Sequence, residues 1–138
     1  MNSMPPIADL DLRRASLCQL LHWLAAGRVQ PQALTDAYQT AIERLNPELN
    51  AYVDMRSGLL QEQAHMADRR RRDGVIGRLD GIPLALKDNF DMAGWPTRVG
   101  LPGREKPVQS DAHVVSRLRA SGAVLVGKTN MDEGALGA

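Results

Sequence analysis

The chain has 138 residues, the size of one small domain, and its 43% hydrophobic and 24% charged residues match an ordinary globular protein rather than a disordered one. Seventeen basic residues against sixteen acidic ones give a formal net charge of +1, so no overall field attracts nucleic acid or an anionic membrane. Cys18 is the only cysteine, which excludes an internal disulfide and favours a cytoplasmic location. Because the sequence has no secretory signal at its start and no apolar run long enough to cross a bilayer, we expect neither export nor membrane insertion.

The first half of the sequence, residues 1–77, is predicted to form a helical arm. Residues 1–12, which include two adjacent prolines, are expected to remain unpacked. A first helix is predicted to start near Ser16, where Gln19 completes a capping box, and to stop at Gly27. A second helix is predicted to begin at Pro31 and to end at the Asn-Pro pair of residues 46–47. Its apolar positions, which recur at three- and four-residue steps, are Leu34, Ala37, Tyr38, Ala41, Ile42 and Leu45.

Residues 49–53 are expected to form a short extended link, and a third helix is predicted from about Ser57 to residues 73–74. The last turn of this helix contains four consecutive arginines, residues 69–72, which favour the negative end of the helix dipole. A nucleic-acid patch is the alternative, but aspartates flank the run and no aromatic residues are interleaved for base stacking. We therefore expect a solvated helix end and no nucleic-acid partner.

Residues 81–91 contain a short apolar run that ends in a lysine, followed by polar residues. Apolar residues between a glycine turn and a polar stop predict a buried strand. Pro83 is expected at the start of this strand or on an edge, because proline cannot donate a ladder hydrogen bond. Lys87 then lies at the carboxyl end of the strand, where open α/β sheets place their chemistry. A lysine that is partly desolvated there can act as a neutral base at about pH 7. Lys87 is therefore the candidate catalytic residue, and a surface lysine at a strand end is the alternative.

The remaining elements complete a parallel strand–helix–strand crossover. Residues 93–110, rich in proline and glycine, are expected to form a long loop, and Ser110 and Asp111 are predicted to cap a fourth helix that closes at Gly122. Val114, Val115 and Leu118 are expected to face inward, with His113 exposed. Residues 123–126 form a continuous apolar run typical of a buried strand. The predicted fold class is α/β, with residues 1–77 as the helical arm and residues 78–138 as the first part of a catalytic domain.

Residues 122–129 match the phosphate-loop pattern G-x-x-x-x-G-K-[ST] letter by letter. A phosphate loop needs its four intervening residues in a loop that curls around phosphate, but here they are Ala-Val-Leu-Val and are needed as a strand. A nucleotide-binding protein is therefore the disfavoured alternative. The three histidines lie far apart, with no Cys, Asp or Glu at ligand spacing, so neither a zinc site nor another cofactor is expected.

Several short blocks from residue 81 onward resemble the N-terminal part of the amidase signature family. In chain order they are Gly81-Ile82-Pro83, Leu86-Lys87-Asp88-Asn89, Ala93-Gly94 with Pro96-Thr97, Asp111-Ala112, Arg117-Leu118-Arg119-Ala120, Gly122-Ala123-Val124 and Gly127-Lys128-Thr129-Asn130-Met131-Asp132-Glu133. Several blocks in the correct order are more specific than any single one. The chain departs from the common family pattern after the Pro-Thr pair. Many members have a segment rich in Thr and Ser there, whereas this chain has Arg98 and Leu101.

The resemblance implies hydrolysis or transfer of amide groups by a serine nucleophile, a second serine on a cis peptide bond, and a lysine, and Lys87 has the position of that lysine. The glycine- and serine-rich segment that carries both serines in the family has no counterpart in these 138 residues. The chain is therefore expected to be the incomplete start of an amidase-type α/β/α sheet. Alone, it is expected to be inactive on small-molecule amides, to fold poorly, and to self-associate through exposed sheet surface.

Two further functions remain open at this point. The first is transfer of an amide group by a protein that resembles the A subunit of a tRNA-dependent amidotransferase. The second is that of a non-catalytic truncated module that binds a partner. Within the amidase interpretation, replacement of Lys128 is expected to be much milder than replacement of Lys87.

Overall fold

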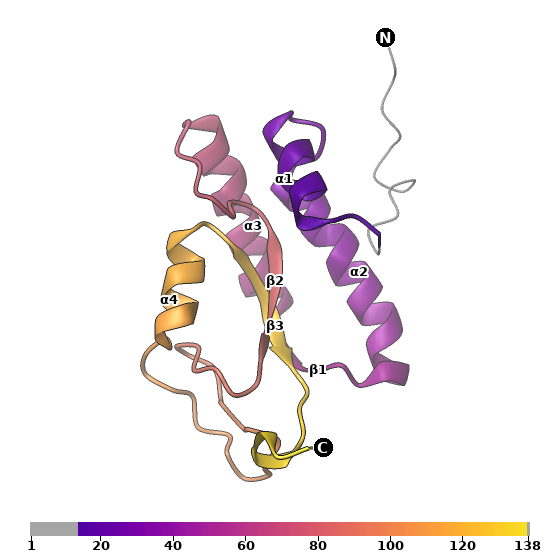
Figure 1. Cartoon of the computed structure of the whole chain (residues 1–138), viewed down its shortest axis with the longest axis vertical. Helices are drawn as coiled ribbons and strands as arrows, with labels where there is room; N and C mark the ends of the chain where they lie inside the picture. Colours follow the sequence, from indigo (N-terminus) through magenta and orange to yellow (C-terminus); the bar gives the residue numbers. More distant parts are fainter. Residues whose placement is uncertain (1–13, 138) are drawn as a thin grey trace.

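A three-stranded sheet lies at the centre of the structure, with its strands in the order β1, β3, β2 (Figure 1). The computed structural model describes residues 14–137, so the unpacked arm expected at residues 1–12 lies outside the described residues. β2 (Pro83–Lys87) pairs in parallel with β3 (Val124–Thr129), and α4 (His113–Ala120) lies in the connection between them. The predicted α/β class and the parallel strand–helix–strand crossover are therefore confirmed.

β1 (Tyr52–Met55) adds an antiparallel strand on the other side of β3, where the sequence predicts only an extended link. Asp54 pairs with Lys128, and Met55 pairs with Gly127. A Cβ atom at position 127 would lie 2.4 Å from the carbonyl oxygen of Asp54, so glycine is needed for this close approach. The strand could not be predicted from its own residues because its hydrogen-bond partners come from the far end of the chain.

The first two helices begin as predicted, but the second ends later. α1 (Leu17–Ala25) has the predicted capping box: Ser16 Oγ accepts from the Gln19 N–H at 3.2 Å, and Gln19 Oε1 accepts from the Ser16 N–H at 2.8 Å. α2 (Pro31–Leu49) continues past Asn46 and through Pro47, so the predicted end at residues 46–47 is wrong. Asn46 explains the difference, because its side chain accepts from the Tyr52 N–H and donates to the Tyr52 carbonyl, which fixes the helix end against β1.

The arginine run at the end of α3 (Ser57–Arg72) is only partly solvated. Asp80, which is fully buried, forms ion pairs with Arg70 Nε at 2.6 Å and with Arg71 Nε at 3.3 Å. The Arg71 guanidinium also donates to the Asp80 carbonyl at 2.7 Å. Arg69 and Arg72 are exposed, as the sequence predicts, but the expectation of a solvated helix end is wrong for the two arginines between them. A buried carboxylate needs a cationic partner, and Arg70 and Arg71 provide it.

α4 also differs from its prediction at its start. The residue at the N-cap is Ala112 and no side chain caps the helix, so the predicted cap by Ser110 and Asp111 is wrong. The Asp111 carboxylate instead accepts from the Ala93 N–H at 2.7 Å and from Arg119 Nε at 2.8 Å, which ties the preceding loop to the helix. Val115 is buried as expected, whereas Val114 is exposed, and His113 is exposed as predicted.

Helices cover both faces of the sheet (Figure 1). Successive residues of β3 alternate between two hydrophobic clusters, as expected for a strand that is buried on both sides. The cluster on the side of α3 contains Leu60, Ala67, Val124 and Val126. The cluster on the side of α4 contains Leu86, Met92, Trp95, Val115, Ala123 and Leu125. α1 and α2 add a third cluster, which contains Leu20, Leu24, Val29, Leu34 and Ile82.

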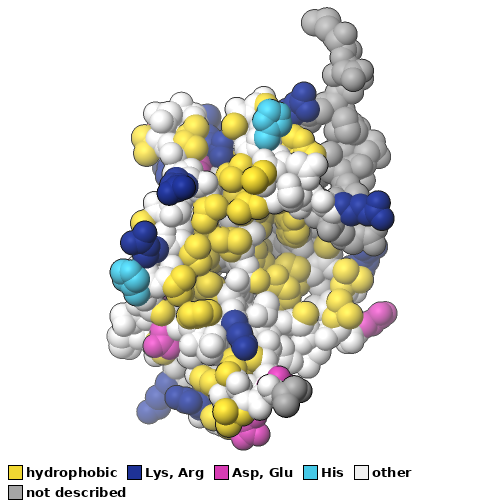
Figure 2. All heavy atoms as spheres, viewed as in Figure 1, with side chains coloured by type: hydrophobic (Ala, Val, Ile, Leu, Met, Phe, Trp, Pro, Cys, Tyr) yellow, Lys and Arg dark blue, Asp and Glu magenta, His cyan; other side chains and the backbone are white. Residues whose placement is uncertain are grey.

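The helical arm is not separate from the sheet in this structure. α2 packs on α3, α3 packs on β3, and β1 pairs with β3. These contacts do not test the predicted division into residues 1–77 and 78–138, which stays a prediction. Figure 2 shows hydrophobic side chains gathered between α4 and the α1–α2 pair, and self-association through such a surface also stays a prediction. Within residues 14–137, no helix combines the length and the apolar character that crossing a bilayer requires.

Candidate functional site

Lys87 is the last residue of β2, at the carboxyl end of a parallel strand, as the sequence predicts. Its side chain is exposed, and within residues 14–137 it forms no hydrogen bond and no ion pair. The described residues therefore do not provide the desolvation expected for this lysine. They leave its amine accessible at the edge of the sheet.

A buried ion pair lies on the opposite face of the same strand end. Lys87 is in register with Thr129, whereas Leu86 is in register with Lys128. Because side chains alternate along a strand, Asp88 and Lys128 lie on the face of Leu86 and Lys87 lies on the other. Lys128 Nζ is 2.8 Å from Asp88 Oδ1, and their side chains are only 0% and 2% exposed. Removal of one partner from such a pair costs about 3–5 kcal/mol, since it leaves an uncompensated buried charge.

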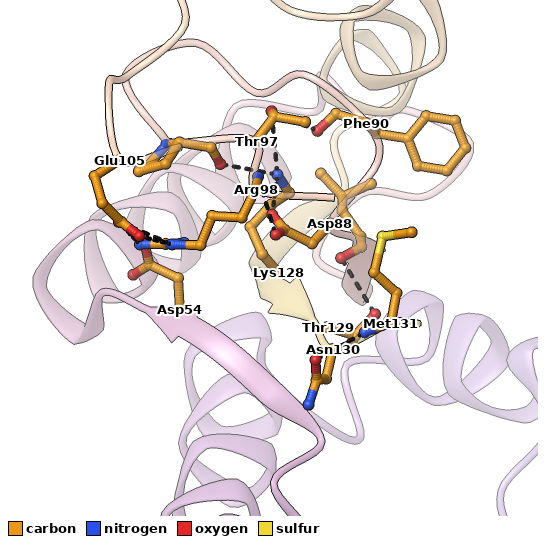
Figure 3. A network of polar contacts seen from close by, with 12 residues as sticks. Asp54, Asp88, Phe90, Thr97, Arg98, Glu105, Lys128, Thr129, Asn130 and Met131 are labelled. Carbon is orange, nitrogen blue, oxygen red and sulfur yellow. Dashed lines mark hydrogen bonds and ion pairs between the residues drawn. The ribbon is translucent and has the colours of Figure 1, made fainter. Parts of the chain in front are cut away.

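The same ion pair fastens the long loop that follows β2 (Figure 3). Lys128 Nζ donates to the Pro96 carbonyl at 3.1 Å and lies 3.5 Å from the Thr97 hydroxyl. Asp88 Oδ2 accepts from the Arg98 N–H at 3.1 Å, and the Asp88 carbonyl accepts from the backbone N–H of residue 99 at 3.2 Å. The loop expected at residues 93–110 is therefore held against both parallel strands by two buried side chains.

Arg98 ties this loop to the third strand. Its guanidinium is bound at two points by the Glu105 carboxylate, at 2.9 and 2.7 Å, and lies 3.5 Å from Asp54 on β1. The hydrogen bond to Glu105 raises the pKa of Arg98 above its usual value; burial opposes this, while the charges of Glu105, Asp54 and Asp88 add to the rise. The departure from the family pattern at this position thus has a structural role.

Thr129 is the cross-strand neighbour of Lys87, but the Thr129 and Asn130 side chains form hydrogen bonds with other groups. The Thr129 hydroxyl donates to the Leu86 carbonyl at 3.4 Å. The Asn130 side chain donates to the Asn50 carbonyl at 3.1 Å and accepts from the Met131 N–H at 2.9 Å. Within the described residues no serine hydroxyl is hydrogen-bonded to Lys87. Residues 14–137 therefore bring a lysine to the site but no nucleophile.

The residues that match the phosphate-loop pattern do not form a phosphate loop in the structure. A strand is predicted at residues 123–126, and β3 begins at Val124 and continues to Thr129, so three of the four intervening residues lie in a strand and not in a loop around phosphate. The two glycines of the pattern have other roles: Gly122 has a φ of +85° and ends α4, and Gly127 allows the backbone of β1 to approach β3 closely. Lys128, which would reach the phosphates in a phosphate loop, is buried against Asp88. In the described part of the chain, no three His, Cys, Asp or Glu side chains form a group that could hold a metal ion.

The Asp88–Lys128 pair is the feature of this site that the sequence did not predict, and little was expected of Lys128. A weak signal was present, because Asp88 lies two positions beyond Leu86 and so must share its buried face. The partner of that carboxylate could not be identified, since Lys128 is far away in the sequence and becomes its neighbour only through β2–β3 pairing.

Comparisons with known proteins show which family the chain is similar to. A family model described as Amidase matches residues 33–138. The A subunit of the glutamyl-tRNA(Gln) amidotransferase of Methylobacillus flagellatus is 44% identical over 123 residues, which cover 88% of this chain and 25% of that protein. A putative amidase, AmiA2, of Mycobacterium bovis is 41% identical over 121 residues, with 88% of this chain and 25% of that protein covered.

The fold is similar to that of a solved enzyme. The peptide amidase from Stenotrophomonas maltophilia superimposes with a TM-score of 0.83 and is 36% identical, over 89% of this chain and 26% of that one. The chain thus spans about a quarter of the length of the relatives that it matches.

Proposed function

Because the chain belongs to the amidase family, we propose that the protein hydrolyses amide bonds and that Lys87 is the general base of this reaction. One observation carries the proposal: the candidate lysine lies, with an accessible amine, at the carboxyl end of a parallel strand in a fold that matches a peptide amidase. This is where an open α/β sheet presents its catalytic groups.

The proposed mechanism follows the family resemblance. A neutral Lys87 takes a proton from a serine on a cis peptide bond, which takes one from the nucleophilic serine as it attacks the amide carbonyl. Backbone N–H groups then stabilise the developing oxyanion, and the C–N bond breaks as the leaving amine takes a proton back from the same relay. Water then hydrolyses the acyl-serine, which releases the acid and restores the serine. In this proposal residues 14–137 contribute the base and its support, while both serines come from outside them; these residues alone are inactive.

Replacement of Lys87 by alanine tests the assignment. In the native protein, Lys87→Ala should lower the turnover of simple amides by about 10²–10⁴-fold, the usual contribution of a general base. Ammonia release from an amide panel is the measurement, and the melting temperature should stay unchanged because the side chain is exposed. Lys106→Ala, at another exposed lysine in the loop, is the matched control and should keep full activity. Near-normal turnover of Lys87→Ala would show that the base is elsewhere.

Amide transfer is the second candidate function. It is supported by the 44% identity to the amidotransferase chain of Methylobacillus flagellatus, which is close to the 41% identity to the putative amidase. An amidotransferase would release ammonia from glutamine and pass it to an aminoacyl-tRNA. Assays with glutamine, with and without glutamyl-tRNA, distinguish the two functions: a hydrolase acts on simple amides without an acceptor.

The proposed location is the cytoplasm. Cys18 is exposed and free, as expected where thiols remain reduced. Fractionation of the native host would test this location.

A further inference from the structure

We propose that Asp88 and Lys128 are positioning residues for Lys87. Their buried ion pair fixes the backbone from which the Lys87 side chain extends. The inference rests on the proposed function, because it assumes that Lys87 is the base. It concerns two residues that take no part in the proton transfers themselves.

The position of the Lys87 amine depends on the Lys87 backbone. The side chain forms no hydrogen bond or ion pair with any of residues 14–137, so within this region no polar group holds its amine in place. The peptide groups beside it are held closely: the Asp88 N–H donates to the Thr129 carbonyl at 3.1 Å, and the Lys87 carbonyl accepts from the Phe90 N–H at 3.1 Å. Anything that moves Asp88 therefore moves Lys87.

Asp88 itself is held from three directions (Figure 3). Its N–H is bound to β3, one carboxylate oxygen lies 2.8 Å from Lys128 Nζ, and the other accepts from the Arg98 N–H at 3.1 Å. Lys128 in turn donates to the Pro96 carbonyl at 3.1 Å. The ion pair thus joins the end of β2, β3 and the long loop at one buried point, directly behind the backbone of Lys87.

Fold stability alone does not account for the buried pair. A buried ion pair is often no more stabilising than neutral side chains of similar size, because desolvation offsets the attraction. Leu86, Met92 and Trp95 form a hydrophobic cluster on the same side of the sheet, so an apolar side chain could be accommodated there. The pair provides what apolar groups lack, which is a directed link between particular atoms of both strands and the loop.

A double variant separates positioning from stability in the native protein. Asp88→Asn combined with Lys128→Met removes both charges, keeps similar side-chain sizes and keeps an acceptor for the Arg98 N–H. Its melting temperature should recover from the losses seen in the two single variants. Its kcat should nevertheless be about 10- to 100-fold below wild type with an unchanged KM, as expected for a misplaced catalytic group. A double variant that folds stably and has wild-type kcat would overturn the proposal.

A second measurement does not depend on activity. The sequence contains only three lysines, Lys87, Lys106 and Lys128, so amine acetylation followed by peptide mass spectrometry reports on each one. The acetylation rate of Lys87 relative to Lys106 should change in the double variant beyond the error of replicate wild-type samples; an unchanged ratio would overturn positioning. If no amide is hydrolysed by the wild type, the proposed function fails, whereas the ratio still shows whether the ion pair positions Lys87.

A milder substitution covers the case in which the double variant does not fold. Asp88→Glu keeps the charge but moves the carboxylate by one methylene group. We expect a lower kcat and a changed acetylation ratio of Lys87 to Lys106. Wild-type values of both quantities in Asp88→Glu would overturn the proposal.

Discussion

A side chain at Gly122 is predicted to destabilise the fold, and a comparison with Gly74 separates the loss of stability into a backbone part and a steric part. Gly122 follows α4 with a φ of +85°, and Gly74 follows α3 with a φ of +74°. A Cβ atom at position 74 would meet no atom within 4 Å. At position 122 it would lie 2.4 Å from Asp80 Oδ1 and 2.8 Å from Asp80 Cα. Asp80 cannot move aside, because it is fully buried and held by Arg70 at 2.6 Å.

The expected magnitudes follow from this difference. Gly74→Ala should cost about 1–2 kcal/mol, the penalty for an L-residue in the left-handed region. Gly122→Ala adds a forced shift of packed atoms, which typically costs a further 1–3 kcal/mol, so we expect a total of about 2–5 kcal/mol. Urea unfolding of the native protein, followed by circular dichroism, measures both variants. Equal losses of stability would refute the reasoning, since they would mean that the approach of Asp80 to Gly122 contributes nothing.

Two further predictions concern stability. Burial, and secondarily the charge of Tyr38, raises the pKa of Tyr52 above its ordinary value of 10.0. The protonated Tyr52 therefore contributes to folding stability in full below about pH 10, and this contribution is lost as the pH rises through the higher pKa of the folded state. Tyr52→Phe should lessen the loss of stability at alkaline pH, measured by urea unfolding. Gln63→Leu should cost about 1–3 kcal/mol for each group left unpaired, because the Gln63 amide bonds both the N–H and the carbonyl of Leu125. Glu62→Leu, at an exposed neighbour, is the control, and similar losses in both variants would contradict the role of the amide.

The sequence by itself determined the features that depend on near neighbours. The capping box of α1 needs only Ser16 and Gln19, which are three residues apart, and the start of α2 needs only Pro31. The parallel crossover follows from two apolar runs separated by a helix, and the position of Lys87 follows from the end of one run. Each of these features is a local preference that the tertiary structure does not oppose.

Only the tertiary structure decided which polar groups are buried together. Asp80 accepts a hydrogen bond from Arg70, which lies ten residues away in the sequence. Gln63 accepts from the backbone N–H of Leu125 across 62 residues, and Lys128 donates to the Pro96 carbonyl across 32 residues. A charged residue is solvated by default, and nothing in its own segment shows that a distant strand will cover it. The energy of such pairs depends on geometry formed by sheet pairing and loop packing. For this reason the sequence identified the exposed Lys87, while the buried Lys128 behind it emerged only from the fold.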